Sequence, residues 1–103
     1  MALNHELSHA RARMIRYRIL KILDAGRPYP VGEGLIGDIL VDIDLDATQM
    51  EIRRALQYLR DIQFVDLTDE RGQPWMASLL PAGIDYLENT RLTQPGIARP
   101  EEM

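Results

Sequence analysis

Apolar residues after position 46 recur every three or four positions, which places their side chains on one stripe of a helix. The stripe consists of Ile52, Ala55, Leu56, Leu59 and Ile62. Thr48 and Glu51 have the T-x-x-E spacing of a capping box, in which each side chain accepts a hydrogen bond from a backbone N–H, and Asp46 is a competing N-cap. The pattern therefore predicts a helix that begins near residues 46–49.

The spacing becomes alternating in the next segment, FVDLT, where polar Asp66 separates apolar Val65 and Leu67. Alternation is typical of a strand that is buried on one face only. The turn DERGQP precedes a second apolar run, WMASL, and its glycine and proline are typical turn residues. The pattern predicts a β-hairpin whose turn spans residues 69–74, with Phe64 and Trp75 as packing residues.

Two further helices are expected before this unit. The first runs from about Leu3 or Asn4 to Ala25, because Gly26 is a typical residue just past a helix end. Its core stripe is Ala12, Ile15, Ile19, Ile22 and Leu23. The second lies in the run GLIGDILVDI, with the core positions Leu35, Ile36, Ile39, Leu40 and Ile43.

A last helix is expected to start near Pro81, a residue favoured at the first helical position, and to turn Ile84 and Leu87 toward the core. From about Arg91 the chain is polar and contains prolines, which predicts an extended or disordered tail. The whole order indicates an α+β, mainly α, winged helix-turn-helix with three core helices, a β-hairpin wing and a C-terminal helix. We expect this domain, with its extended N-terminal helix, over residues 1–91 and a flexible proline-containing tail over residues 92–103.

The first helix carries a second apolar line that lies off its core stripe and has no place in a minimal three-helix core. This line comprises Leu3, Leu7, Ala10 and Met14. We predict that it forms the interface of a homodimer. A frayed N-terminus is the alternative interpretation.

Composition narrows the possible chemistry. With 103 residues and 46% hydrophobic content, the chain suits one small domain with a single core. It contains no cysteine, which excludes disulfides, thiolate zinc sites and thiol nucleophiles, and fits a reducing cytoplasm. No apolar run approaches the roughly 20 residues that cross a bilayer, and the N-terminus lacks the apolar region of a signal peptide, so we expect no membrane partner.

Charge is distributed unevenly along the chain. The net charge of −4 has the wrong sign for a protein whose whole surface binds phosphate. The basic block contains Arg11, Arg13, Arg16, Arg18, Lys21 and Arg27, and the acidic block that follows contains Glu33, Asp38, Asp42, Asp44 and Asp46. Such blocks suit self-association or a protein partner, and they equally suit solvated helix faces.

Two sets of motifs resemble known proteins. I-R-R-A-L-Q-Y-L, a hairpin and L-L-P-A-G-I-D-Y-L resemble winged-helix transcription regulators, which implies that residues 48–62 form the recognition helix and residues 69–74 the wing. Across almost the whole chain, R-Y-R-I-L-K-I-L, Y-P-V-G-E-G-L-I, W-M-A-S-L-L-P-A-G-I-D-Y-L and P-G-I-A-R-P resemble a family of small proteins with a winged or ArsR-like helix-turn-helix encoded in Mu-like bacteriophages and prophages. This resemblance implies a phage origin, the cytoplasm of a bacterial host and possible phage protein partners. One departure is Gln63-Phe64, where many winged helices have a glycine, and it leaves the exact helix end open.

If the third helix enters a major groove, the face opposite Leu56 must read the bases. That face holds Met50, Arg53, Arg54, Gln57 and Asp61. Arginine pairs with guanine and glutamine with adenine, while Gln49 and Tyr58 are placed to reach phosphate or sugar. We therefore predict DNA contacts by Gln49, Arg53, Arg54 and Gln57, with Arg71 as the cation of the wing.

Acidic residues oppose this prediction, because carboxylates near the phosphate backbone subtract from the electrostatic attraction. They are Glu51, Asp61, Asp66, Asp69 and Glu70. Arg53 and Arg54 are alternatively ordinary surface residues that form weak ion pairs. The sequence favours a DNA-binding or regulatory module over a winged helix that binds only proteins in phage assembly or packaging.

The segment HELSH, residues 5–9, matches the H-E-x-x-H motif, in which two histidines bind zinc and the glutamate acts as general base. The chain has no further histidine to supply a third ligand, and Asp24 lies roughly 20 Å away along the same helix. No other catalytic constellation is present. We therefore predict a non-enzymatic protein without a metal or cofactor.

Overall fold

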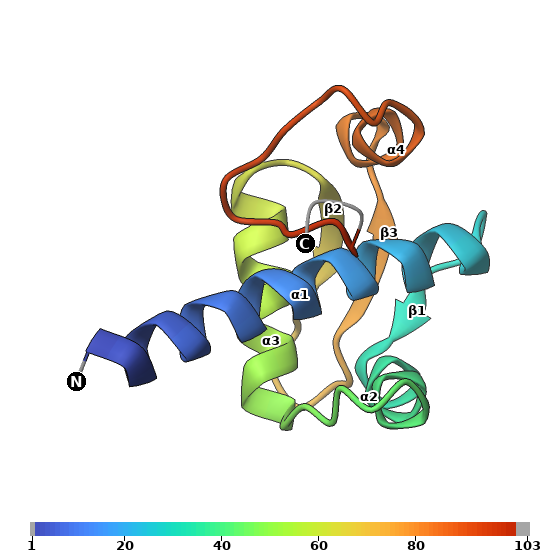
Figure 1. Ribbon diagram of the computed structural model, residues 1–103. Coiled ribbons are helices and arrows are strands. Elements are labelled where there is room, and N and C mark those ends of the chain that lie inside the picture. The colour runs from blue at the N-terminus through green and yellow to red at the C-terminus, as the bar shows by residue number, and fades with distance from the viewer. Residues whose placement is uncertain (1, 101–103) are drawn as a thin grey trace.

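Four helices surround a small three-stranded antiparallel sheet in the computed structural model, which describes residues 2–100 (Figure 1). The order is α1 (Ala2–Gly26), β1 (Val31–Gly32), α2 (Glu33–Asp42), α3 (Gln49–Asp61), β2 (Val65–Thr68), β3 (Met76–Leu79) and α4 (Pro81–Glu88). The fold is α+β and mainly helical, as expected. Its layout is compatible with a winged helix.

The sheet has the order β1-β3-β2, so the second strand of the hairpin lies in the middle. The hairpin pairs Val65 with Leu79 and Thr68 with Met76, and β1 pairs Val31 with Ala77. The hairpin was predicted, whereas β1 was not, because a strand of two residues carries no alternation to detect. Through β1 the start of α2 is attached directly to the hairpin.

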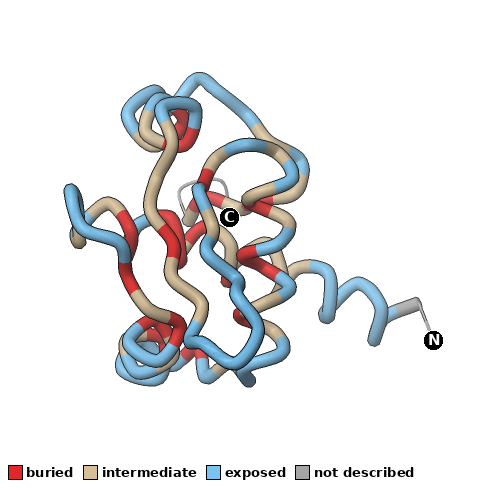
Figure 2. The backbone as a smooth tube through the Cα atoms, turned by 180° about the vertical axis from the view of Figure 1, so that it is seen from behind, coloured by how far each residue is buried: buried red, intermediate tan, exposed pale blue. Residues whose placement is uncertain are grey.

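A single core lies between the helices and the sheet (Figure 2). The predicted stripes of α1 and α3 are largely confirmed, with Ala12 and Ile62 only half-buried. The buried members of these stripes are Ile15, Ile19, Ile22, Leu23, Ile52, Ala55, Leu56 and Leu59. Each fully buried aliphatic side chain contributes about 1.5–3 kcal/mol to stability.

Two core predictions for the shorter helices are wrong in part. In α2 the buried positions are Glu33, Ile36 and Leu40, so Leu35 and Ile43 fall outside this stripe and are exposed. Leu35, Ile39 and Ile43 recur at helical spacing just as Ile36 and Leu40 do, so periodicity alone could not choose between two adjacent apolar stripes. In α4, likewise, Gly83 and Tyr86 are buried whereas the predicted Ile84 and Leu87 are half-buried.

The ends of α3 are fixed by local hydrogen bonds. The capping box is confirmed, because the Thr48 hydroxyl accepts from the Glu51 N–H at 3.1 Å and the Glu51 carboxylate accepts from the Thr48 N–H at 3.0 Å. At the other end the Phe64 N–H donates to the Leu59 carbonyl at 2.9 Å, while Gln63 has a φ of 63°. Gln63 thus adopts the left-handed conformation that a glycine usually takes after a helix. The helix ends at Asp61, although the chain has no glycine at this point.

The C-terminal segment differs from the flexible tail that was expected. Ile97 and Arg99 are 3% and 2% exposed. The Ala98 N–H donates to the Arg13 carbonyl at 3.3 Å, and the Arg16 guanidinium donates to the Gly96 carbonyl at 2.9 Å. Residues 92–100 therefore belong to the folded unit, and the remaining tail residues lie outside the described part of the chain.

The Arg99 guanidinium explains how a polar segment packs against the core. It donates to the carbonyls of Tyr86, Asn89 and Leu92 and lies 3.9 Å from the centre of the Tyr86 ring. Buried charge is tolerated where hydrogen bonds replace water. Because these carbonyls lie at and after the end of α4, Arg99 holds that end against the returning chain.

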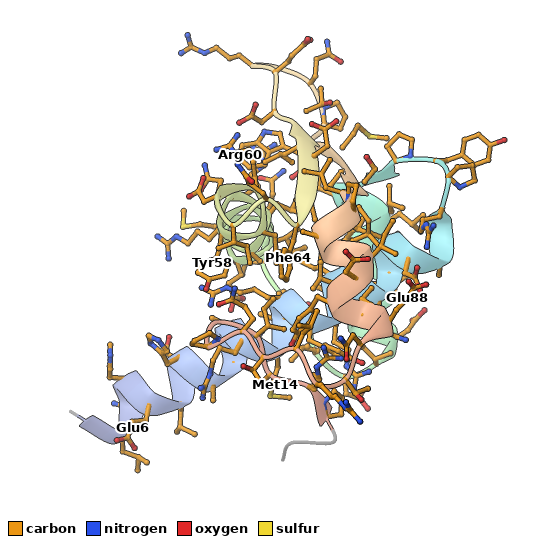
Figure 3. The ribbon with its side chains drawn as sticks, turned by 90° about the horizontal axis from the view of Figure 1, so that it is seen from above. Glu6, Met14, Tyr58, Arg60, Phe64 and Glu88 are labelled. Carbon is orange, nitrogen blue, oxygen red and sulfur yellow. The ribbon has the colours of Figure 1, made fainter. Side chains whose placement is uncertain are left out.

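The predicted dimer line on α1 is divided by this segment. Leu3 and Leu7 are 65% and 61% exposed on the part of α1 that projects from the body (Figure 2). Ala10 and Met14 are half-buried and line a hollow together with Ile97. Figure 3 shows Met14 beside the C-terminal segment and Glu6 at the projecting end. Only the first two positions of the line remain open to a second chain.

Replacing Ile97 with alanine tests whether the C-terminal segment is part of the core. We expect Ile97→Ala to lower the free energy of unfolding by about 2–4 kcal/mol, because it removes buried methyl groups and leaves a cavity. Leu92→Ala is the matched control, since Leu92 is exposed, and it should change stability by less than about 0.5 kcal/mol. Urea denaturation followed by circular dichroism measures both, and equal effects would contradict a packed segment.

Candidate nucleic-acid interface

The outward face of α3 carries most of the residues for which the sequence predicted DNA contacts. Along this ridge Met50, Arg54, Gln57 and Asp61 are exposed, and none of them belongs to the core. Gln49 is exposed at the first turn, whereas Arg53 is half-buried. The hairpin β2–β3 follows directly after α3 and packs beside it (Figure 3). The predicted DNA-contacting residues of α3 therefore do not share one environment.

Arg53 is held by a buried carboxylate. Its Nε donates to Oε1 of Glu33 at 2.8 Å, and its Nη2 donates to Oε2 at 2.8 Å. Such a two-point pair is the strongest geometry between a guanidinium and a carboxylate. Glu33 is buried at the start of α2, so this pair joins α2 to α3.

Trp75 completes the same cluster. Its backbone N–H donates to Oε2 of Glu33 at 2.7 Å, and its carbonyl accepts from the Glu33 N–H at 2.9 Å. The Arg53 guanidinium lies 4.5 Å from the centre of the indole ring, within the range of cation–π attraction. Trp75 is half-buried against the core, as predicted. We call Glu33, Arg53 and Trp75 the Glu33 cluster; it joins α2, α3 and the base of the hairpin.

The ionisation of Glu33 reflects these contacts. Hydrogen bonds from Arg53 lower the pKa of the Glu33 carboxyl below its ordinary value of 4.5, and the Trp75 N–H lowers it further, although burial acts in the opposite direction. The same pair raises the pKa of Arg53. Glu33 therefore stays charged at neutral pH, and Arg53 stays bound to it.

Other cations near α3 are engaged in the same manner. Arg60 donates to Asp69 of the hairpin turn at 2.8 Å and lies 3.9 Å from Asp61. Arg11 of α1 donates to Glu51 at 2.8 Å, which lowers the pKa of Glu51. These exposed pairs contribute little stability, but they reduce the positive charge that phosphate would meet. Within residues 2–100, Arg54 and Arg71 are the two predicted DNA contacts that are cationic and form no ion pair.

The structure groups the predicted residues on two sides of α3. Gln49, Arg53 and Arg71 line one groove of about 700 Å³ between the start of α2, α3 and the hairpin turn. The acidic Asp69 and Glu70 line it as well. Arg54 instead lines a hollow on the α1 side of the helix. Gln57 lies on the exposed ridge between the two sides.

Sequence reasoning missed the role of Glu33. It appeared only as one member of an acidic block, and its partners lie 20 and 42 positions away. A two-point pair over such a separation leaves no periodic signal. The one available hint was an acidic residue at the start of an apolar helix, which is also common at solvated helix ends.

The H-E-x-x-H motif lies on the projecting part of α1. The rings of His5 and His9 are 5.4 Å apart, and both residues are exposed. Among residues 2–100 no group of three or more histidines or acidic residues is placed to hold a metal ion. Over the same range, every helix is too short or too polar to cross a membrane.

The Glu33 cluster predicts a defined response to Glu33→Gln. We expect the free energy of unfolding at pH 7 to fall by about 1–3 kcal/mol, because a charge-assisted pair is lost inside the fold. The fluorescence of Trp75 should shift as well, and since it is the single tryptophan of the chain the signal is unambiguous. Glu88→Gln, an exposed control, should change neither quantity.

The same variant predicts a change in pH dependence. A carboxyl whose pKa is lowered by folding stabilises the protein above its unfolded pKa and loses this effect as the pH falls through its folded pKa. The difference in stability between wild type and Glu33→Gln should therefore be full above pH 4.5 and shrink below it. Denaturation at several pH values between 7 and 3 measures this, and a constant difference would contradict the assigned ion pair.

Comparison with known proteins does not assign this chain to a family. No protein-family model matches the chain, and no curated protein and no solved structure matches it. The resemblance to small phage proteins thus stays a prediction. What the site can do follows from its geometry and charge.

Proposed function

We propose that this chain is a non-enzymatic winged-helix module that reads DNA with the outward face of α3. The observation that supports this best is an exposed polar ridge on the second helix of an α2–α3 pair, followed at once by a hairpin. In helix-turn-helix proteins the corresponding helix enters the major groove. This assignment rests on the arrangement of elements, which is an argument by analogy.

The residues suit unequal roles in this proposal. Arg54 and Gln57 are the base readers, because both are exposed and Arg54 forms no ion pair within the described chain. Arginine forks onto guanine and glutamine onto adenine. Gln49 and Arg71 contact the backbone from the groove beside the hairpin. Arg53 positions the hairpin through Glu33 and is not a base reader, which changes the role that the sequence predicted for it.

Electrostatics limits how such a protein can bind. Arg71 is the unpaired cation that this proposal places on the DNA backbone, so each chain neutralises about one phosphate, and the logarithm of affinity should fall with the logarithm of salt with a slope of about −1 per chain. Non-specific binding should therefore be weak. Recognition then depends on contacts with base edges.

Pairing of two chains would double the number of DNA contacts and so compensate for the weak binding of one chain. We propose that the exposed Leu3 and Leu7 of α1 join two copies, as the apolar line predicted, so that two α3 helices read two half-sites. A regulatory role in a phage, within a bacterial cytoplasm, agrees with the resemblance of the sequence. Possible phage protein partners belong to the same proposal.

A second candidate function is a winged helix that binds only proteins during phage assembly or packaging. It is favoured by the exposed acids Asp61, Asp66 and Glu70 near the proposed DNA face, together with the paired Arg53 and Arg60. Carboxylates at such positions repel phosphate. The two candidates differ in whether DNA is retained at all.

DNA binding is tested with fragments that tile the genome carrying this coding sequence. We expect one fragment to be retained at moderate salt, and Arg54→Ala with Gln57→Ala to weaken its binding at least about tenfold while leaving the denaturation curve unchanged, because lost base contacts cost about 1–3 kcal/mol each. Arg91→Ala with Gln94→Ala is a control pair away from α3. Absence of retention even at low salt would reject DNA reading and favour the protein-binding candidate.

Self-association is tested by the mass of the protein in solution. Leu3→Asp with Leu7→Asp should convert a dimer into a monomer, because charge placed in an apolar contact is costly to bury. Tyr29→Asp removes another exposed apolar residue, beyond the other end of α1, and should leave the mass unchanged. Light scattering after size exclusion measures all three proteins; a wild-type monomer would contradict pairing through α1.

A further inference from the structure

A second exposed surface lies on the outer side of α2, at the lower end of the molecule in Figure 1 and apart from the C-terminal segment. Leu35 and Val41 are 55% and 52% exposed there, and Ile43 just after the helix is also exposed. Isolated apolar residues on a surface are ordinary, but here three lie within nine positions, and one of them, Val41, lines a groove.

This surface has the geometry of one helix face. Leu35, Asp38 and Asp42 follow the spacing i, i+3, i+7, which places them in one row, and Val41 lies beside this row. The opposite side of α2 carries Ile36 and Leu40, which are fully buried. The residues of the outer row therefore do not pack in the core.

A groove adjoins this row at Asp38. It has a volume of about 300 Å³ and lies between α2 and the start of α3. Its apolar lining comes from Val41, Ala47 and Ile52, with Asp38 among the polar lining. At Gly34 a Cβ atom would meet nothing within 4 Å, so the groove is open along that side. Its size suits one or two aliphatic side chains.

Charge identifies the kind of occupant. No lysine, arginine or histidine occurs between positions 28 and 52. Two acids of this stretch are paired, Glu33 with Arg53 and Glu51 with Arg11. The other four are exposed and form no ion pair within residues 2–100, namely Asp38, Asp42, Asp44 and Asp46. A groove that is lined by Asp38 and lies on this acidic, cation-free stretch of chain complements an aliphatic and cationic ligand.

We propose that this face docks a cationic amphipathic helix of a partner protein. An aliphatic side chain of that helix enters the groove beside Val41, and its lysines or arginines lie against Asp38 and Asp42. Phosphate is excluded as an occupant by the sign of the charge. Three cations of a second copy, Arg11, Arg16 and Arg27, are engaged within their own chain, and the mass measurement below decides whether its other cations occupy this face.

The proposal does not depend on DNA reading, since it uses neither Arg54 nor Gln57. Its probe is a labelled peptide of about 18 residues with leucine and lysine at helical spacing, and a matched peptide has glutamate in place of lysine. Fluorescence anisotropy at moderate salt measures affinity for the full chain. We expect the lysine peptide to bind and the glutamate peptide to remain free.

Variants locate the binding surface. Asp38→Lys with Asp42→Lys should weaken binding of the lysine peptide at least about tenfold, because it reverses the charge at the groove. Asp66→Lys with Asp85→Lys makes the same change in net charge at exposed positions of β2 and α4, and should weaken binding less than about threefold. Val41→Ser removes the apolar contact with little risk to folding and should weaken binding about threefold or more.

Three outcomes would overturn the proposal. Equal weakening by both charge-reversed pairs would mean general attraction to an acidic protein, and no binding of the lysine peptide would mean no docking site of this chemistry. A change in the mass of the protein alone on Asp38→Lys with Asp42→Lys would assign the face to a second copy. Retention of a DNA fragment by all these variants would leave the proposed DNA face intact, so failure of one proposal is separable from failure of the other.

Discussion

The buried carboxylate of Glu33 is the constraint on which the arrangement around α3 depends. It accepts two hydrogen bonds from Arg53 and one from the backbone of Trp75, while its own N–H donates to the Trp75 carbonyl. A buried charge is costly unless such partners replace water. One side chain thereby fixes the start of α2, the inner side of α3 and the base of the hairpin relative to one another. The geometry of the whole candidate interface follows from that attachment.

The same constraint shapes the electrostatics of the surface. An arginine that holds the hairpin in place is not free to meet phosphate, and Arg60 and Arg11 are paired in a similar way. The face of α3 consequently offers a short polar ridge and little net positive charge. Any nucleic acid bound there is held mainly by base contacts, whose strength depends on hydrogen-bond geometry more than on salt. The outer side of α2 is acidic as well, and it suits a cationic segment of a protein.

The C-terminal segment extends the core beyond the helices. Ile97 fills an apolar site, and Arg99 brings its charge inside only because three backbone carbonyls and the Tyr86 ring receive it. The Tyr58 hydroxyl lies against Gly96 and occupies the space that a Cβ atom at position 96 would need. By covering Ala10 and Met14, this segment also limits the apolar surface that α1 offers to a second chain.

Local features were determined by the sequence alone. The stripes of α1 and α3, the capping box at Thr48 and Glu51, the hairpin and the start of α4 at Pro81 all follow from contacts between residues close along the chain, which leave a regular spacing. Only the tertiary structure decided the strand β1, the inner face of α2, the pairing of Arg53 with Glu33 and the burial of Ile97 and Arg99. The strand β1, the pairing of Arg53 with Glu33 and the burial of Ile97 depend on contacts between residues 20 or more positions apart. The burial of Arg99 depends on backbone carbonyls 7–13 positions away, and the inner face of α2 depends on which of its apolar residues meet the core. None of these contacts leaves a periodic signal. The candidate site was thus predictable as a helix face but not as a set of free and engaged side chains, because ion pairing across the fold determines which cations remain available.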